Sequence, residues 1–153
     1  MVGPAVVAIF NSSPDAIALL SAPLREAGFT VVTALIHELR ERRVDLDHFL
    51  RTHRPHVVVF DVGPPYGLNW RLLDRLREMP SAKGVRFIVT SVNPQRAEEL
   101  SRGEQTIYEV IGKPYDLKQI ADAVAEAVRI ARDGRIAEGL LHDAVAHHRR
   151  DAS

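Results

Sequence analysis

Hydrophobic residues in this chain fall into two patterns, namely short continuous runs and longer stretches in which they recur every three or four positions. The continuous runs are rich in β-branched residues and end at turn formers, which is typical of strands buried on both faces of a parallel sheet. Five such runs span residues 5–10, 29–34, 56–61, 85–90 and 107–111.

The stretches between these runs have the apolar spacing of helices. Ser13 is the expected N-cap of the first helix, with Pro14 at its first position, where a missing N–H costs nothing. Asp45 and Asp116 are the expected caps of two later helices. Strands that alternate with helices predict βαβ units, and therefore a doubly wound, flavodoxin-like α/β fold with a five-stranded parallel sheet.

The last part of the chain is expected to form a separate helical extension. We predict one domain over residues 1–131 and a helical C-terminal tail over residues 132–153, with Gly134 interrupting the helix between them. The tail carries an apolar stripe that we expect to pack back on the domain or against another chain. Its members are Ile136, Leu140, Leu141, Ala144 and Val145.

Composition narrows the class of protein. The chain has 153 residues, of which 46% are hydrophobic and 26% charged, and its formal net charge is zero, so nothing steers it toward nucleic acid or an anionic membrane. The absence of cysteine excludes disulfides, thiolate metal sites and cysteine nucleophiles. No apolar run reaches the roughly 20 residues of a membrane span, and the N-terminus lacks a signal-peptide pattern. We therefore expect a cytoplasmic protein.

Candidate functional residues follow from the fold, because ligands of doubly wound sheets bind at the carboxyl ends of the strands. The polar side chains at those ends are Asn11, Ser12, Asp61, Thr90, Ser91 and Lys113. The chain has no glycine-rich phosphate loop and no hydrolase or metalloprotease motif, so we do not expect an enzyme.

Over about residues 5–131 the chain resembles the CheY-like receiver domains of response regulators. In that family an aspartate ends the third strand, a hydroxyl residue ends the fourth, and a Lys-Pro dipeptide follows the fifth. Asp61, Thr90 or Ser91, and Lys113-Pro114 match these positions. The resemblance implies a stand-alone receiver in two-component, or phosphorelay, signal transduction. Its Asp61 would accept a phosphoryl group from a sensor histidine kinase or a phosphotransfer protein.

The resemblance also implies roles for the neighbouring groups. Lys113 would pair with the phosphoryl group, and the hydroxyl of Thr90 or Ser91 would hydrogen-bond to it. Mg²⁺ would be held by Asp61 and the backbone carbonyl of Gly63. The family adds an acidic pair after the first strand, whereas this chain has Asn11 and Ser12 there, which are weak ligands for Mg²⁺.

That departure leaves a second interpretation open, in which the chain is a pseudo-receiver that acts as an interaction or ligand-gated module without phosphorylation. In both interpretations the expected partners are proteins: a downstream partner, and a second copy bound through the tail helix. Neither nucleic acid nor membrane is expected as a partner.

Four smaller predictions concern side chains around this site. Many receivers carry an aromatic switch residue where this chain has Val110, and Tyr108 should share a sheet face with Val110 because strand side chains repeat every two residues. The peptide bond that precedes Pro114 would be cis, as in the family. Tyr66 and Trp70 are expected to pack beside the loop after Asp61, with a ligand pocket as the alternative. The basic run of Arg40, Arg42 and Arg43 is expected to form a solvated helical face, with a partner surface as the alternative.

Overall fold

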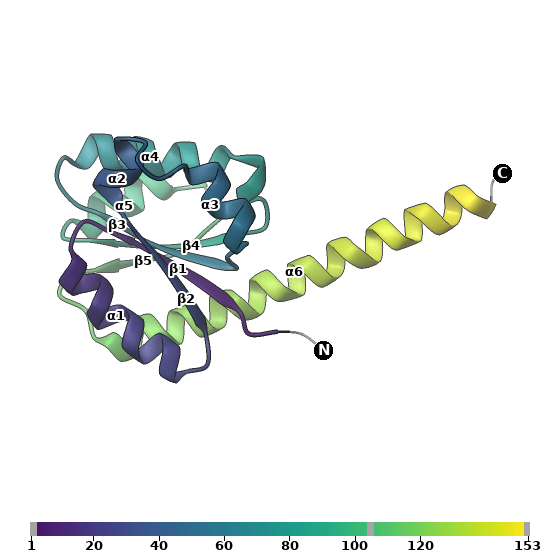
Figure 1. Ribbon diagram of the computed structural model, residues 1–153, viewed down its shortest axis with the longest axis horizontal. Helices are drawn as coiled ribbons and strands as arrows, with labels where there is room; N and C mark the ends of the chain where they lie inside the picture. Colours follow the sequence, from purple (N-terminus) through teal and green to yellow (C-terminus); the bar gives the residue numbers. More distant parts are fainter. Residues whose placement is uncertain (1–2, 104–105, 152–153) are drawn as a thin grey trace.

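The computed structural model describes residues 3–103 and 106–151. Its centre is one sheet of five parallel strands in the order β2-β1-β3-β4-β5 (Figure 1). The strands are β1 (Val6–Asn11), β2 (Thr30–Leu35), β3 (Val57–Val62), β4 (Arg86–Ser91) and β5 (Ile107–Gly112). The predicted doubly wound, flavodoxin-like fold is confirmed.

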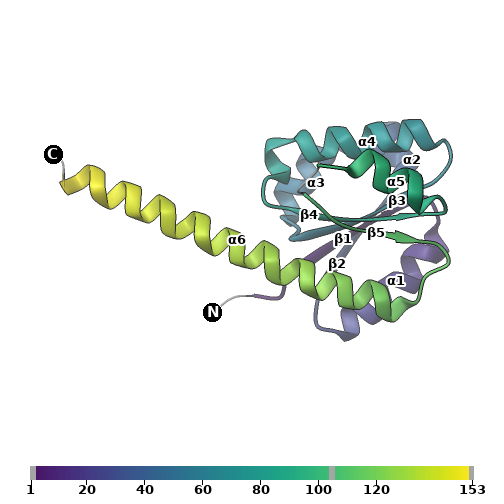
Figure 2. The ribbon, with the colours of Figure 1, turned by 180° about the vertical axis from the view of Figure 1, so that it is seen from behind.

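Helices cover both faces of the sheet (Figures 1 and 2). On one face lie α1 (Pro14–Glu26) and the first part of α6 (Leu117–Asp151). The other face carries α2 (Ile36–Arg40), α3 (Leu46–His53), α4 (Tyr66–Glu78), the 3-10 turn η1 (Pro80–Ala82) and α5 (Pro94–Ser101). No helix in the described part of the chain is both long and apolar enough to cross a membrane.

The core consists of two apolar layers separated by the sheet. Along β3, Val58 and Phe60 pack into the layer beneath α2–α5, whereas Val57 and Val59 pack into the layer beneath α1 and α6. All six residues of β3 are buried. This alternation explains why the strand is a continuous apolar run, since both of its faces are covered.

The predicted helix starts are present. The Ser13 hydroxyl accepts a hydrogen bond from the Ala16 amide at 3.2 Å, and Pro14 occupies the first turn of α1. Asp45 caps α3 by accepting from the His48 amide at 3.1 Å. The Asp116 carboxylate accepts from the Lys118 amide at 2.9 Å, directly before α6. These side chains satisfy amides that would otherwise lack a partner at the helix ends.

The prediction that Gly134 interrupts the last helix is wrong. A single helix, α6, runs from Leu117 to Asp151 without a break and extends away from the body (Figure 1). One helical glycine costs only about 1 kcal/mol relative to alanine, which the good helix formers around it offset. Ile136 and Leu140 are 58% and 66% exposed, so this part of the apolar stripe does not pack back on the domain. The other stripe side chains, Leu141, Ala144 and Val145, lie outside the described ones.

The basic run does not form one helical face. Arg40 is the last residue of α2, and Arg42 follows in the left-handed conformation with φ of 60°. Arg43 pairs with Glu41 in the same turn. The chain therefore turns sharply within the run, and Arg40 points to a different environment from Arg42 and Arg43.

Tyr108 and Val110 do not share a sheet face. The register between β4 and β5 shifts, because Phe87 pairs with Ile107 but Ile88 pairs with Glu109. This bulge inserts one residue and reverses the alternation beyond it. Tyr108 consequently packs in the layer of α1 and α6, and Val110 in the layer of α2–α5.

Candidate functional site

The carboxyl ends of β3, β4 and β5 bring Asp61, Thr90 and Lys113 together. Asp61 is opposite Thr90 in the strand register, and Lys113 directly follows β5. Asp61 is 3% exposed and Thr90 is fully buried. Three of the six residues predicted from strand ends therefore form one cluster, in which Asp61 and Thr90 are buried and Lys113 is partly exposed.

Both partners contact the same oxygen of Asp61. The Thr90 hydroxyl donates a hydrogen bond to Oδ1 at 2.7 Å. The Nζ of Lys113 lies 2.5 Å from the same Oδ1. A buried carboxylate is costly unless it is paired and hydrogen-bonded, and here one cation and one hydroxyl meet that need.

Backbone contacts between β4 and β5 hold Lys113 in place. Its amide donates to the carbonyl of Ser91 at 2.9 Å, and the peptide bond between Lys113 and Pro114 is cis. The preceding residue, Gly112, lies against the start of α5, where a Cβ would come within 2.8 Å of Cγ of Pro94. Glycine at position 112 thus permits the close approach of β5 to α5 directly beside Lys113.

Ser91 lies on the other face of the sheet from Thr90. It is opposite Val62, and its hydroxyl accepts from the Asn93 amide at 3.0 Å, where it stabilises the turn before α5. The structure therefore brings Thr90, and not Ser91, to Asp61.

At the end of β1, the amide oxygen of Asn11 takes part in a turn. Asn11 is 2% exposed, and its amide oxygen accepts from the Ser13 amide at 3.0 Å. Ser12 is exposed. Asn11 thus supports the turn into α1.

The carbonyl of Gly63 is already hydrogen-bonded. Nδ2 of Asn69, on α4, donates to it at 2.7 Å. The Oδ1 of Asn69 accepts in turn from the Arg40 guanidinium at 3.2 Å, and Asn69 is 2% exposed. We call this chain of Arg40, Asn69 and Gly63 the amide clasp. No sequence pattern points to Asn69, which lies in the first turn of α4 and meets Gly63 only in the folded structure.

The groups predicted to hold Mg²⁺ include few carboxylates. Mg²⁺ requires oxygen ligands in near-octahedral geometry and favours carboxylates. Asp61 is the one carboxylate in the predicted ligand set, and its Oδ1 already accepts from Thr90 and Lys113. The other predicted ligands, Asn11, Ser12 and the carbonyl of Gly63, are neutral, and the oxygens of Asn11 and Gly63 each accept one hydrogen bond from an N–H group. Among the described residues no group of three or more histidine, aspartate or glutamate side chains lies close enough to hold a metal.

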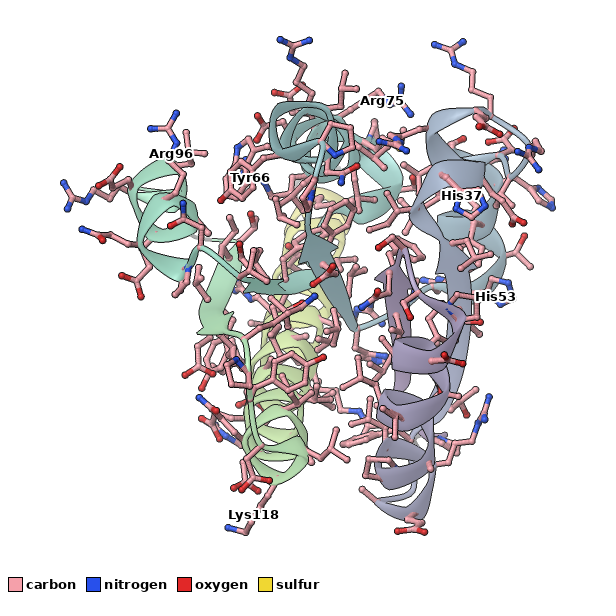
Figure 3. The ribbon with its side chains drawn as sticks, turned by 90° about the vertical axis from the view of Figure 1, so that its left-hand side faces the viewer. His37, His53, Tyr66, Arg75, Arg96 and Lys118 are labelled. Carbon is pink, nitrogen blue, oxygen red and sulfur yellow. The ribbon has the colours of Figure 1, made fainter. Side chains whose placement is uncertain are left out.

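Three aromatic residues follow the ends of β3 and β5, namely Tyr66 and Trp70 on α4 and Tyr115 after β5. The rings of Tyr66 and Trp70 stack with centroids 6.4 Å apart, and both pack in the α2–α5 layer, as expected for packing residues. Burial raises the pKa of Tyr66, whereas the neighbouring Ser91 hydroxyl and the charge of Arg96 act to lower it. Figure 3 shows Tyr66 on α4 and Arg96 on α5. Burial also raises the pKa of Tyr115, and the negative charge of Asp61 raises it further. Tyr115 is therefore part of the electrostatic environment of Asp61.

Comparison with known proteins supports the fold and not a narrower assignment. No protein-family model matches the chain, and no curated protein matches it. A response regulator from Thermotoga maritima is 21% identical, with a TM-score of 0.64 over 84% of this chain and 99% of that one. A CheY-like receiver domain protein from Methanospirillum hungatei is 13% identical, with a TM-score of 0.68 over 86% and 99% of the two chains.

A further structural neighbour is described as an adenylate cyclase from Rhodopirellula baltica. It is 13% identical, with a TM-score of 0.74, and the match covers 91% of this chain and 98% of that one. At such identities the similarity concerns the fold. The similarity to the two receiver structures, together with the strand order β2-β1-β3-β4-β5, shows that this chain has the fold of CheY-like response-regulator receiver domains.

Proposed function

We propose that this protein is a receiver-fold interaction module that works without Mg²⁺ and without phosphorylation of Asp61. The observation that carries the proposal is the amide clasp, in which Nδ2 of Asn69 donates to the carbonyl of Gly63 at 2.7 Å and would compete with a metal ion for that oxygen. The same carbonyl is the backbone ligand that the receiver resemblance assigns to Mg²⁺. Phosphoryl transfer needs positive charge to stabilise its transition state, and the missing acidic pair removes the means of holding that charge.

In this proposal Asp61, Thr90 and Lys113 form a permanent structural cluster. The salt bridge connects the ends of β3 and β5, and the hydroxyl of Thr90 joins β4 to it. Because Asp61 is buried, loss of its salt bridge with Lys113 would alter the position of the loop after β5. The cluster thereby fixes the shape of the surface formed by α5, β5 and the start of α6.

That surface is where we place the protein partner. Three apolar side chains are exposed there. Val92, in the loop before α5, is 64% exposed, and Leu100 on α5 and Leu117 at the start of α6 are each 36% exposed. Where such side chains gather into one patch, they would form a surface that a protein partner covers.

The second candidate function is that of a phosphoacceptor receiver. The convergence of Thr90 and Lys113 on Asp61 favours it, since a receiver would use the same ammonium and hydroxyl to bind phosphoryl oxygens. A sensor histidine kinase or a phosphotransfer protein would then be the donor.

One experiment separates the two functions. The full chain is incubated with acetyl phosphate and millimolar Mg²⁺, and its mass is measured; a parallel sample receives beryllofluoride and is followed by NMR. We expect no added phosphoryl mass and no shift of the Thr90 and Lys113 amides. Phosphorylation that Asp61→Asn abolishes would overturn the proposal in favour of the phosphoacceptor.

A further inference from the structure

A groove at the opposite end of the sheet from Asp61 has an unusual concentration of positive charge. It has a volume of about 750 Å³ and lies between the end of α3, η1 and α6. Figures 1 and 2 show α6 leaving the body at the end of the molecule where α3 lies. Pro55 and Lys83 line the groove just before β3 and β4 begin. The strands are six residues long, so the groove is roughly 20 Å from Asp61.

The groove combines cations with an apolar floor. Its basic lining residues are Arg51, Arg54, Lys83 and Arg135, and its acidic one is Glu138. Leu50, Pro55 and Pro80 supply apolar surface. A concave site of this size, with apolar walls and a few converging charges, has the character of a small-molecule pocket.

Of the four basic lining residues, one forms an ion pair within the described part of the chain. Arg51 pairs with Asp47 at 2.9 Å, but Arg54 and Lys83 form no ion pair within the described part of the chain. Arg135 donates to the carbonyl of Pro55 at 2.8 Å, and Arg132 donates to that of Gly3 at 2.6 Å. Two partly buried guanidinium groups are thus held in place by neutral carbonyl oxygens.

Neighbouring groups respond to this excess of positive charge. Burial together with the charges of Arg135, Arg132 and Arg54 lowers the pKa of His56 to about 4. The pKa of Arg135 is itself lowered by burial and then by Arg54 and Arg132, with only Glu138 opposing them. Cations that are held close together and repel one another create a focused positive potential, which attracts anions.

The chain adopts an unfavourable backbone conformation at the same place. Arg54 ends α3 in the left-handed region, with φ of 47°, which is uncommon for residues other than glycine and asparagine. Glycine or asparagine would satisfy the turn at lower cost. The presence of arginine there is explained if its guanidinium has a task in the groove.

We propose that this groove binds a small phosphorylated ligand, whose anionic groups contact Arg54, Lys83 and Arg135 while its organic part lies over Pro55 and Pro80. Phosphate groups match the fork of donors that arginine presents. The chemistry fits a nucleotide and a sugar diphosphate equally, and the ligand would bind whether or not Asp61 is phosphorylated.

The test uses the full chain and inorganic pyrophosphate as the probe, with calorimetry at low salt and NMR to locate the site. We expect pyrophosphate to shift amides of the groove, and Arg54→Asn and Lys83→Gln each to weaken binding by about tenfold. Asparagine keeps the left-handed conformation, so the first variant preserves the fold. Glu138→Gln removes the opposing carboxylate and should tighten binding about threefold.

The matched control is Lys118→Gln, which removes an exposed lysine that pairs with Asp122 near the N-terminus of α6, away from the groove. This variant should leave the pyrophosphate affinity unchanged. Adenosine, which has no phosphate, should not bind measurably. If ADP binds more tightly than pyrophosphate, the ligand is a nucleotide. If a sugar diphosphate binds more tightly, the ligand is a phosphorylated sugar. Absence of pyrophosphate binding at millimolar concentration overturns the proposal. Equal losses in Lys118→Gln and Lys83→Gln overturn it too, as does a site that binds polyglutamate but not pyrophosphate, because that site would take an acidic protein segment.

Discussion

The Nζ of Lys113 lies 2.5 Å from Oδ1 of Asp61, and the two side chains are 29% and 4% exposed. The aspartate is therefore the buried partner, and the lysine connects it to the surface. Removing one partner of such a pair leaves an uncompensated charge, which is far more costly than removing an exposed pair.

We expect Lys113→Met to lower the free energy of unfolding by about 2–4 kcal/mol, because the Asp61 carboxylate would stay buried without its cation. Urea denaturation measures the loss. Lys118→Met, at an exposed ion pair, is the control and should change stability by less than about 0.5 kcal/mol. Asp61→Asn should rescue the Lys113→Met variant in part, and a double variant as unstable as the sum of the two would contradict the pairing.

Thr90→Val keeps the shape of the side chain but removes the hydrogen bond to Asp61. We expect a loss of about 1–2 kcal/mol in the free energy of unfolding, since a hydrogen bond to a charged, buried acceptor is lost. Thermal and urea unfolding would show it. The exposed Thr52→Val is the control. If Thr90→Val were as stable as the wild type, the hydroxyl of Thr90 would have no role in holding Asp61.

Restoring the acidic pair should create a metal site. In the double variant Asn11→Asp, Ser12→Asp, carboxylates replace a neutral amide and a hydroxyl at the end of β1, close to Asp61. We expect millimolar Mg²⁺ to raise the melting temperature of this variant by several degrees and to leave that of the wild type unchanged. Adding Asn69→Ala, which frees the Gly63 carbonyl, should strengthen the effect. Equal stabilisation of the wild type would contradict the poor fit for Mg²⁺.

Acid should destabilise the protein partly through His56. Its pKa is lowered to about 4 in the folded state, so the unfolded chain, with an ordinary imidazole pKa near 6.5, binds the proton more tightly. Stability is therefore fully present above about pH 6.5 and falls as the pH decreases toward about 4. His56 is partly exposed to solvent, so we expect the loss to be about 1–2 kcal/mol.

The measurement is urea denaturation at several pH values for wild type and His56→Asn. In the wild type, the Val6 amide donates to Nδ1 of His56 at 3.2 Å. An asparagine side chain offers an oxygen that can accept the same bond, but it does not titrate. The variant should show a shallower dependence between pH 4 and 6.5. Identical slopes would mean that His56 is protonated equally in both states.

The tail helix is predicted to join two copies of the chain. Ile136 and Leu140 are one helical turn apart and mostly exposed, so they lie on one face of α6 that the domain leaves uncovered. Sedimentation velocity should show a dimer whose dissociation constant rises by about tenfold or more in Ile136→Glu, Leu140→Glu. Leu19→Glu changes an equally exposed leucine on α1 and serves as control. A monomeric wild type would exclude the homodimer.

The sequence predicted most of the strands and helix caps because these depend on local chemistry. A continuous run such as Val57–Phe60 indicates a doubly buried strand, and Ser13 or Asp45 caps a helix through contacts three residues away. Strand order then placed Asp61, Thr90 and Lys113 at one edge of the sheet before any distance was known.

The features that were not predicted depend on contacts between distant residues. The choice between Thr90 and Ser91 needs the register of β4, and the positions of Tyr108 and Val110 need the bulge in β5. The bond from Asn69 to Gly63 joins two elements by packing alone, so it has no local pattern. The predicted interruption of the helix at Gly134 was wrong because the cost of one helical glycine is outweighed by the helix formers around it.

Because α6 is continuous across Gly134, its projecting part moves together with the part that is packed on the sheet. The first part of the helix is fixed by buried residues from Ile120 to Ala131 and by the bonds of Arg132 and Arg135 to backbone carbonyls. From Arg135 to Asp151 it extends roughly 25 Å without a hinge. A rotation of a few degrees at the packed end would therefore displace the far end by an ångström or more. A ligand in the basic groove, which Arg135 and Glu138 line, would contact α6 at the base of this projecting part.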